Sequence, residues 1–235
     1  MLYSLETVRE NLRNRAGKRV FYLGKGDTLT SSARDYLQRE RIEILPAEQA
    51  KPARYRLPGG GWMEEKPEHM THLNGDTLVP KTHPRIRFRG KLDTLEAELL
   101  LCGAECSQYR GELAEILNGV RELLRREVLE EPVEDKPLCG LTEGEIRKQS
   151  HFPQDYYGQP HFMPAFTDGT ALLRLNRCRC AAREAELAAA AAFVSQDGIP
   201  ARTDLLRAMN RLSSMLYLLM IREKARMQTE RESES

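Results

Sequence analysis

Residues 171–193 read ALLRLNRCRCAAREAELAAAAAF and predict the long helix around which the fold is organised. Its leucines and its alanine-rich second half give a small-residue surface, which lets a neighbouring helix approach closely. Arg179 and Arg183 stand four residues apart, so they lie on one helix face, where both guanidinium groups can bind a single polyanion. The alternative is an ordinary solvated surface, because helix arginines are mostly exposed or paired with carboxylates.

The next helix is predicted over residues 204–221 and is the expected packing partner of the first. Its apolar residues recur at spacings of three and four, namely Leu205, Met209, Leu212, Met215, Leu216 and Leu219. The polar segment Asn-Arg-Leu-Ser-Ser, residues 210–214, lies in the middle of this pattern. That polar segment is the unusual feature of the helix.

Length and charge limit the classes of protein that fit. The chain has 235 residues, with 36 lysines and arginines against 35 aspartates and glutamates. A nearly neutral chain without a basic stripe argues against a general nucleic-acid or membrane-surface binder. The longest apolar runs fall well short of the roughly 20 residues of a membrane span, and the N-terminus lacks a signal-peptide core. We therefore expect a cytoplasmic protein with one main domain and a small appendage.

Five cysteines without regular spacing predict free thiols in a reducing compartment. Cys102 and Cys106 fall on one helix face, but a zinc site needs about four ligands, and no His or Cys cluster lies near them in the sequence. Small buried thiols are therefore the favoured interpretation.

The first 46 residues predict a small α/β unit. We expect a helix over 5–15 that ends at Gly17, a strand over 19–23, a helix over 31–40 capped by Thr30, and a strand over 42–45. The Gly-Lys-Gly-Asp step at 24–27 is too short for a phosphate-binding loop and predicts a turn. Residues 47–70 are rich in proline and glycine and predict a linker or flap.

A helical-bundle domain is predicted over residues 71–228, followed by a disordered tail over 229–235. Apolar residues at helical spacing predict helices over 91–106 and 108–129, which either form an antiparallel pair joined near residues 103–108 or run on with a kink there. Thr142 and Glu145 form a candidate capping box for a short helix that ends at Ser150. The aromatic-rich loop 151–169 should cover an apolar surface. The expected fold is therefore mainly α, with four long helices and one shorter helix.

Three sequence blocks resemble the ATP:cob(I)alamin adenosyltransferases of the propanediol-utilization type. The blocks are Asn-Arg-Leu-Ser-Ser-Met-Leu-Tyr-Leu-Leu-Met at 210–220, Arg-x-x-x-Arg-Glu at 179–184, and Val79 to Ile86 followed by Gly90-Lys-Leu-Asp93. Within that superfamily the sequence resembles the ethanolamine-utilization branch best, through residues 29–34, 71–73 and 140–146. The resemblance covers most of the chain. It implies a five-helix bundle that assembles as a homotrimer, with a dimer as the alternative, and that forms its active sites across subunits.

The resemblance also implies a reaction. The 5′-deoxyadenosyl group of ATP passes to cob(I)alamin, giving tripolyphosphate and adenosylcobalamin, the coenzyme of ethanolamine ammonia-lyase. A flavoprotein reductase is the implied electron donor, and association with a bacterial microcompartment is implied. The alternative is a helical scaffold in the same pathway that binds a corrinoid or nucleotide without turnover. Matching residues favour the enzyme: Lys81, Asp93, Arg179, Arg183 and Asn210.

Carried over by position, the family motifs assign roles to individual residues. Catalysis is assigned to Arg183, Arg179 and Asp93, and Asp93 is expected to pair with Arg179 across the subunit boundary. ATP binding is assigned to Lys81, Arg85, Thr71, Asn74, Asn210 and Arg211. Corrinoid binding is assigned to Phe162, His161 and Phe166, with Phe162 first as the ring that replaces the lower axial ligand of cobalt. Ala182 and Ser214 depart from the superfamily pattern, but ethanolamine-type members share both departures.

Magnesium is expected to arrive with ATP near Asn210, because cationic clamps and a magnesium ion stabilise charge that grows at a leaving oxygen. Many ethanolamine-type enzymes also hold a transition metal through a histidine and a Cys-Cys-x-x-Cys cluster. This sequence has His69 and His72 in that region but no cysteine before Cys102. We therefore expect no iron or zinc site.

Overall fold

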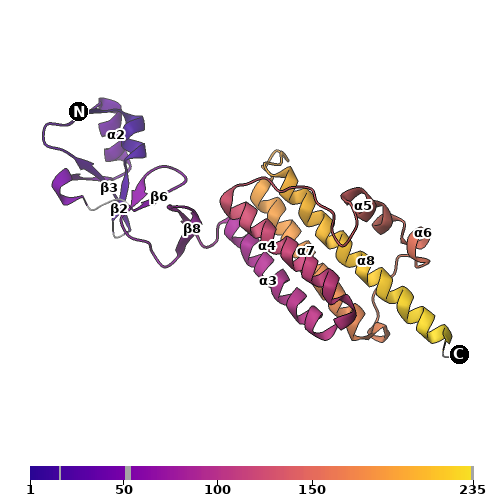
Figure 1. The fold of residues 1–235 in the computed structure, drawn as a ribbon. Coiled ribbons are helices and arrows are strands. Elements are labelled where there is room, and N and C mark those ends of the chain that lie inside the picture. The colour runs from indigo at the N-terminus through magenta and orange to yellow at the C-terminus, as the bar shows by residue number, and fades with distance from the viewer. Residues whose placement is uncertain (16, 51–53, 234–235) are drawn as a thin grey trace. The chain divides into compact units, whose positions relative to one another are not determined.

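The computed structural model describes residues 1–15, 17–50 and 54–233, and the chain folds as two compact units, Met1–His83 and Pro84–Ser235 (Figure 1). The expected division at residue 71 differs from the observed one. Strands β8 (Met70–Asn74) and β9 (Thr77–Pro80) pair antiparallel and belong to the sheet of the first unit. The helical unit therefore begins only where Pro84 opens helix α3.

The first unit is built on a seven-stranded sheet. Its strand order is β5 (Glu43–Pro46), β3 (Lys18–Leu23), β2 (Arg13–Arg15), β7 (Trp62–Met63), β6 (Tyr55–Arg56), β9 and β8. Strands β1 (Leu2–Tyr3) and β4 (Thr28–Leu29) form a separate parallel pair. Helices α1 (Leu5–Glu10) and α2 (Ser31–Arg39) enclose a small apolar core with β3, formed by Val8, Leu12, Phe21, Ala33, Leu37 and Ile42. The predicted cap is confirmed, because the Thr30 side chain accepts a hydrogen bond from the backbone N–H of Ala33.

Two predictions for this unit are wrong. The helix expected over 5–15 ends at Glu10, and residues 13–15 form β2, which pairs antiparallel with β3. Gly17, with φ of +80°, lies in the turn of that hairpin instead of ending a helix. The expected linker contributes β6 and β7 to the sheet, along with a short 3-10 turn over Ala47–Gln49, and residues 51–53 of it lie outside the described part of the chain.

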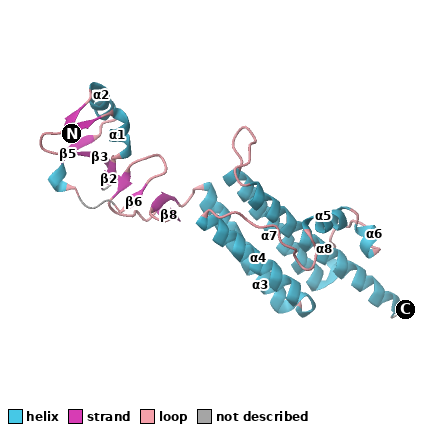
Figure 2. Ribbon diagram, turned by 45° about the horizontal axis from the view of Figure 1, so that its top comes forward, coloured by secondary structure: helices cyan, strands magenta, loops and turns pink. Residues whose placement is uncertain are grey.

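The second unit is the predicted mainly α bundle. Its long helices are α3 (Pro84–Glu105), α4 (Arg110–Leu129), α7 (Gly169–Phe193) and α8 (Thr203–Ser233), and α5 (Glu143–His151) is the shorter fifth helix (Figure 2). Helix α6 (Pro153–Tyr157) is a single short addition within the aromatic-rich loop. The capping box of Thr142 and Glu145 is present. No helix among the described residues is long and apolar enough to cross a membrane.

Helix α7 packs against α8, the partner expected from the sequence, and also against α3. The buried face of its second half consists of small side chains: Ala181, Ala182, Ala185, Ala188 and Ala189. Small residues allow the neighbouring helix backbones to approach closely, and their own desolvation costs little. Because this face is buried, the other face of α7, which carries Arg179 and Arg183, is held in a fixed direction.

Helix α8 is longer than expected, which corrects the prediction of a disordered tail. It continues as regular helix through residue 233, and only residues 234–235 fall outside the description. Glu223, which is 2% exposed, explains part of this extension. It accepts a hydrogen bond from the Tyr109 hydroxyl at 3.0 Å, which fastens α8 to the bundle at this residue, and it pairs with Arg226 of the same helix at 2.8 Å.

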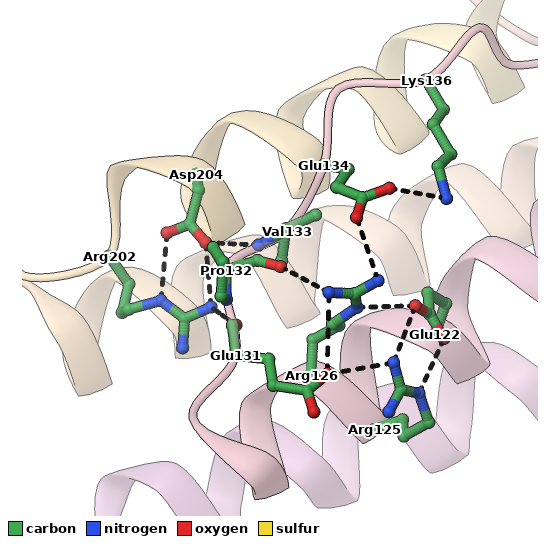
Figure 3. A network of polar contacts seen from close by, with 10 residues as sticks. All are labelled: Glu122, Arg125, Arg126, Glu131, Pro132, Val133, Glu134, Lys136, Arg202 and Asp204. Carbon is green, nitrogen blue, oxygen red and sulfur yellow. Dashed lines mark hydrogen bonds and ion pairs between the residues drawn. The ribbon is translucent and has the colours of Figure 1, made fainter.

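A network of ion pairs holds the loop of residues 130–137, which follows α4 (Figure 3). Asp204, in the first turn of α8, pairs with Arg202 at 2.9 Å and accepts a hydrogen bond from the Val133 backbone N–H at 2.8 Å. On α4, Arg126 pairs with Glu122 at 2.7 Å and donates to the Pro132 carbonyl. These contacts hold residues 131–134 against α4 and the start of α8.

All five cysteines are free thiols, as predicted, and Cys102, Cys106 and Cys178 are buried in the bundle. Burial raises the pKa of Cys106 to about 12. The pKa of Cys102 is also raised, first by its hydrogen bond with Cys178 and then by burial. The Cys102 and Cys106 thiols are therefore protonated at neutral pH and act as small apolar side chains.

Candidate functional site

Helix α7 presents Arg179 and Arg183 to a polar cavity of about 300 Å³. The remaining lining comes from the end of α5, from one further α7 residue and from the polar segment of α8, namely Ser150, His151, Glu186, Asn210, Ser213, Ser214 and Tyr217. The cavity thus combines the arginine pair of α7 with the polar middle of α8. We call it the polar cavity.

The two arginines are held differently. The guanidinium carbon of Arg179 lies 5.3 Å from the centroid of the Tyr217 ring, within the range of a cation–aromatic interaction. Arg183 is exposed and makes no hydrogen bond or ion pair with any residue that the structure describes. A solvated guanidinium without a protein carboxylate keeps all of its donors for an external anion.

Asn210 has a fixed place in the polar cavity. Its amide nitrogen donates to Glu186 Oε1 at 2.8 Å, and its amide oxygen accepts a hydrogen bond from Arg211. The hydroxyls of Ser213 and Ser214 both donate to the Asn210 backbone carbonyl at 3.0 Å. These contacts place amide, hydroxyl and carboxylate groups opposite the two arginines.

A second cavity of about 530 Å³ adjoins the first. Its lining is mostly apolar and combines the aromatic-rich loop with α7 and α8: His161, Phe162, Met163, Pro164, Asn176, Arg179, Cys180, Tyr217 and Met220. We call it the apolar cavity. Because Arg179 and Tyr217 line both cavities, the two spaces share one wall.

The aromatic-rich loop is fastened to that wall through His161. Its ring stacks on Tyr217 with centroids 5.8 Å apart and an interplanar angle of 11°. His161 Nε2 lies 3.2 Å from the His151 carbonyl, which can only accept, so Nε2 carries the proton in the neutral ring. Nδ1 then accepts from the Tyr217 hydroxyl at 2.7 Å. Burial raises the pKa of Tyr217, which keeps that hydroxyl protonated as the donor.

The other two loop candidates differ in burial. Phe162 is half-buried against the bundle core and lines the apolar cavity, with Lys224 Nζ 5.4 Å from its ring centroid. Lys224 itself pairs with the buried Asp168, and this pairing lowers the pKa of the Asp168 carboxyl. Phe166 is fully exposed and does not line the cavity.

Several predicted residues are not among those that line the two cavities. Asp93 is exposed on α3 and makes no ion pair within the described chain, with Arg179 or any other residue. Lys81 belongs to the first unit, where it pairs with Glu68 at 3.2 Å, and Thr71 and Asn74 lie on β8 of that unit. The roles assigned to these residues stay predictions.

Arg85 takes part in an ion-pair cluster of the second unit, and its expected contact with ATP stays a prediction. It donates to Glu127 Oε1 at 2.5 Å and to Glu130 at 2.8 Å, and Arg89 donates to the other Glu127 oxygen at 2.5 Å. Glu127 is 0% exposed, so removal of either arginine would leave a buried carboxylate poorly compensated. The cluster therefore joins α3 to the end of α4.

Tyr217 and Glu186 are site residues that the sequence reasoning missed. The spacing contained a signal for both. Tyr217 follows Asn210 by seven residues and Glu186 follows Arg183 by three, so each shares a helix face with a residue already identified. Ser150 and His151 carried no such signal, because only the packing of α5 against α8 brings them to the cavity.

In the described part of the chain, no group of three or more His, Cys, Asp and Glu side chains is arranged to hold a metal ion. The polar cavity nevertheless contains oxygen groups of the kind that Mg²⁺ prefers, on Glu186, Asn210, Ser213 and Ser214. Magnesium sites commonly use one or two protein carboxylates and complete their shell with substrate phosphates and water. The residues present fit such a site.

Comparison with known proteins identifies the family of this chain. The sequence model of the family described as cobalamin adenosyltransferase matches residues 62–223. The corrinoid adenosyltransferase EutT of Salmonella typhimurium is 34% identical over 158 residues, and that of Escherichia coli K12 is 33% identical over the same length. In both cases the match covers 67% of this chain and 59% of the relative's length. This chain belongs to the cobalamin adenosyltransferase family.

Proposed function

We propose that this chain transfers the 5′-deoxyadenosyl group of ATP to cob(I)alamin, giving adenosylcobalamin and tripolyphosphate. The observation that carries the proposal is the pair of adjoining cavities, one polar and one apolar, that share Arg179 and Tyr217. The reaction joins a polyanionic nucleotide to a large, largely apolar ring. A site for it needs these two environments side by side.

The polar cavity suits the triphosphate. When the bond between C5′ and its oxygen breaks, the electron pair passes to that oxygen, and negative charge grows on the departing tripolyphosphate. A guanidinium at that place stabilises the transition state more than the ground state, which is the condition for catalysis. Arg183 has its donors available for this role, and Arg179 adds a second positive charge one turn earlier on α7.

The apolar cavity suits the corrinoid. The Co(I) electron pair attacks C5′, so the Co–C bond forms as the C–O bond breaks, and no further oxidant or reductant is consumed in this step. Phe162 is the loop ring that is both half-buried and part of the cavity lining, which makes it the best candidate to lie against the lower face of the corrin. A ring there would exclude water and the lower axial base from cobalt.

The proposed reaction also requires a magnesium ion and a source of Co(I). Mg²⁺ would arrive with ATP, with Glu186 and Asn210 as the groups able to hold it, and it would neutralise phosphate charge. A flavoprotein reductase would supply Co(I) from Co(II), and the product would serve ethanolamine ammonia-lyase. The relatives are named corrinoid adenosyltransferase EutT, which supports the corrinoid as substrate and the ethanolamine branch.

Assembly is part of the proposal. Asp93 is exposed and without an ion-pair partner among the described residues of its own chain. A second copy, in a homotrimer or a dimer, would bring Arg179 to it and complete the site across the subunit boundary.

The direct test is anaerobic incubation of the protein with ATP, magnesium and chemically reduced cob(I)alamin. The proposal predicts a product with the spectrum of an alkylcobalamin that light destroys, together with one tripolyphosphate per product. Binding of both substrates without product would instead favour a non-catalytic scaffold.

A further inference from the structure

The amide orientation of Asn210 is determined by its two neighbours. The Glu186 carboxylate can only accept a hydrogen bond, and the Arg211 guanidinium can only donate one. Asn210 meets both requirements in one orientation, with Nδ2 toward Glu186 and Oδ1 toward Arg211. A flip of the amide would place donor against donor and acceptor against acceptor. One N–H and one oxygen lone pair of the amide are then left for a ligand of the polar cavity.

Arg211 itself does not line the polar cavity. It lines a different cavity, of about 330 Å³, together with residues of α4, α5 and the loop 133–138. The α8 backbone therefore directs two consecutive side chains to two different spaces, and the Arg211 contact with the Asn210 amide connects them. The lining of the polar cavity does not include Arg211, so a role through Asn210 is an alternative to the direct ATP contact expected from the sequence.

The burial of Arg211 is poorly compensated. Its side chain is 17% exposed, and its Nε and Nη1 atoms are buried without a hydrogen-bond acceptor. The nearest carboxylate, Glu143 Oε1, lies 3.8 Å from Nε, and burial lowers the pKa of the guanidinium. A charge held in this way costs stability, and an apolar side chain of similar length would fill the space at lower cost. Stability alone therefore does not explain an arginine here.

We propose that Arg211 is a positioning residue that holds the Asn210 amide in its ATP-binding orientation. This inference rests on the proposed function for the identity of the ligand. The orientation itself is a property of the free protein and can be measured without turnover. Arg211 acts through Asn210 and touches no substrate.

Arg211→Met is the principal variant and Arg207→Met is its matched control. Arg207 lies one turn earlier on α8 and has the same 3.8 Å distance to Glu143 Oε1, but it is 62% exposed and is not one of the two partners of the Asn210 amide. Arg211→Met should weaken ATP binding about 10- to 100-fold, the range for losing a hydrogen bond to a charged group. Its midpoint of thermal unfolding should stay the same or rise. Arg207→Met should bind ATP as the parent does, and Arg211→Lys should recover part of the affinity.

Two further measurements separate positioning from a general structural effect. In an Asn210→Ala background, Arg211→Met should change ATP affinity less than about twofold, because two residues that act through one contact are not additive. In the free protein, the side-chain amide resonances of Asn210, assigned by their loss in Asn210→Ala, should shift or broaden in Arg211→Met and stay in place in Arg207→Met.

The outcomes are distinguishable from failure of the proposed function. An unmoved Asn210 resonance in folded Arg211→Met, unchanged ATP affinity, or an additive loss in the Asn210→Ala background would each overturn the positioning role. If the resonance and ATP affinity change as predicted while no variant makes an adenosylated product, the positioning role stands and the proposed reaction fails.

Discussion

The guanidinium carbon of Arg179 lies 5.3 Å from the centroid of the Tyr217 ring, and these two side chains form the common wall of the polar and apolar cavities. A cation–aromatic pair at this wall can present a charged group to the polar cavity and an aromatic ring to the apolar cavity. The Arg179 guanidinium contributes charge to the polar cavity, and the Tyr217 ring contributes to the apolar lining. Stacking of His161 on the same ring fastens the aromatic-rich loop to this point.

Phe162 and Phe166 should have different effects when replaced by alanine. Phe162→Ala removes a half-buried ring from the apolar cavity, so water or the corrinoid's own base can reach the lower face of cobalt. We expect normal ATP binding, slow turnover from Co(II), and recovery of much of the rate when chemically prepared Co(I) is supplied. Phe166→Ala, at a fully exposed position, is the matched control and should behave as the parent.

Absorption spectra of Co(II)alamin bound together with ATP test the same residue directly. The parent and Phe166→Ala should give the four-coordinate spectrum, and Phe162→Ala the five-coordinate one. A four-coordinate spectrum from Phe162→Ala would assign the ring to His161 or another residue.

Asp93→Asn should weaken the oligomer or the affinity for ATP. If Asp93 pairs with Arg179 of another copy, the variant leaves a guanidinium without its carboxylate, at a cost of about 3–5 kcal/mol when the pair is fully buried. Sedimentation and ATP titration measure the two effects. An oligomer and kinetics identical to the parent would show that the pairing is misassigned.

Asp204 should make the free energy of unfolding depend on pH in the acid range. Its hydrogen bond from Arg202 lowers its pKa to about 2, below the unfolded value of about 3.9. The folded state therefore binds fewer protons, and the stabilisation is present above about pH 4 and lost as pH falls toward 2. Asp204→Asn should lower the free energy of unfolding by about 1 kcal/mol at pH 7, with the difference vanishing near pH 2.

Urea unfolding of parent and variant at several pH values measures this. Asp155→Asn, at an exposed aspartate of the same unit, controls for the loss of a carboxylate. A difference between parent and Asp204→Asn that does not change with pH would contradict the account of the loop network (Figure 3).

The bundle could be predicted because its signals are local and long. Apolar residues at spacings of three and four over many turns indicate helices with little ambiguity, and the capping box at Thr142 defines where α5 begins. The strands β6 and β7 are two residues each, too short for an alternating pattern, and they exist through pairing with each other and with distant β2 and β9. No local pattern could reveal them.

The candidate site also has a part that local sequence patterns predict and a part that depends on packing. The arginine pair and Asn210 follow from spacing on single helices. The opposite directions of Asn210 and Arg211, the burial of Arg85 against Glu127, and the exposure of Phe166 depend on how separate elements pack. Consecutive residues on a helix point in different directions, so they can reach different cavities. Helical spacing shows which residues share a face, but it does not show what that face packs against.

We predict turnover without iron or zinc, because the sequence has no cysteine before Cys102 and so lacks the thiolate cluster of many ethanolamine-type enzymes. Activity in magnesium buffer should survive chelators selective for transition metals. Loss of turnover that only Fe(II) or Zn(II) restores would contradict this prediction.

The most direct test of the central claim, that the Arg179 and Arg183 cavity holds the triphosphate of an adenosyl donor, is the rate of adenosylcobalamin formation from ATP and pre-reduced cob(I)alamin in Arg183→Ala. Arg177→Ala on the same helix, where Arg177 pairs with Glu98 at 2.9 Å, is the control. We predict that Arg183→Ala lowers kcat/KM for ATP by about 10²–10³-fold or more, while Arg177→Ala retains the parent rate. Parent-like turnover by a folded Arg183→Ala protein, or no product from the parent itself, would contradict the account.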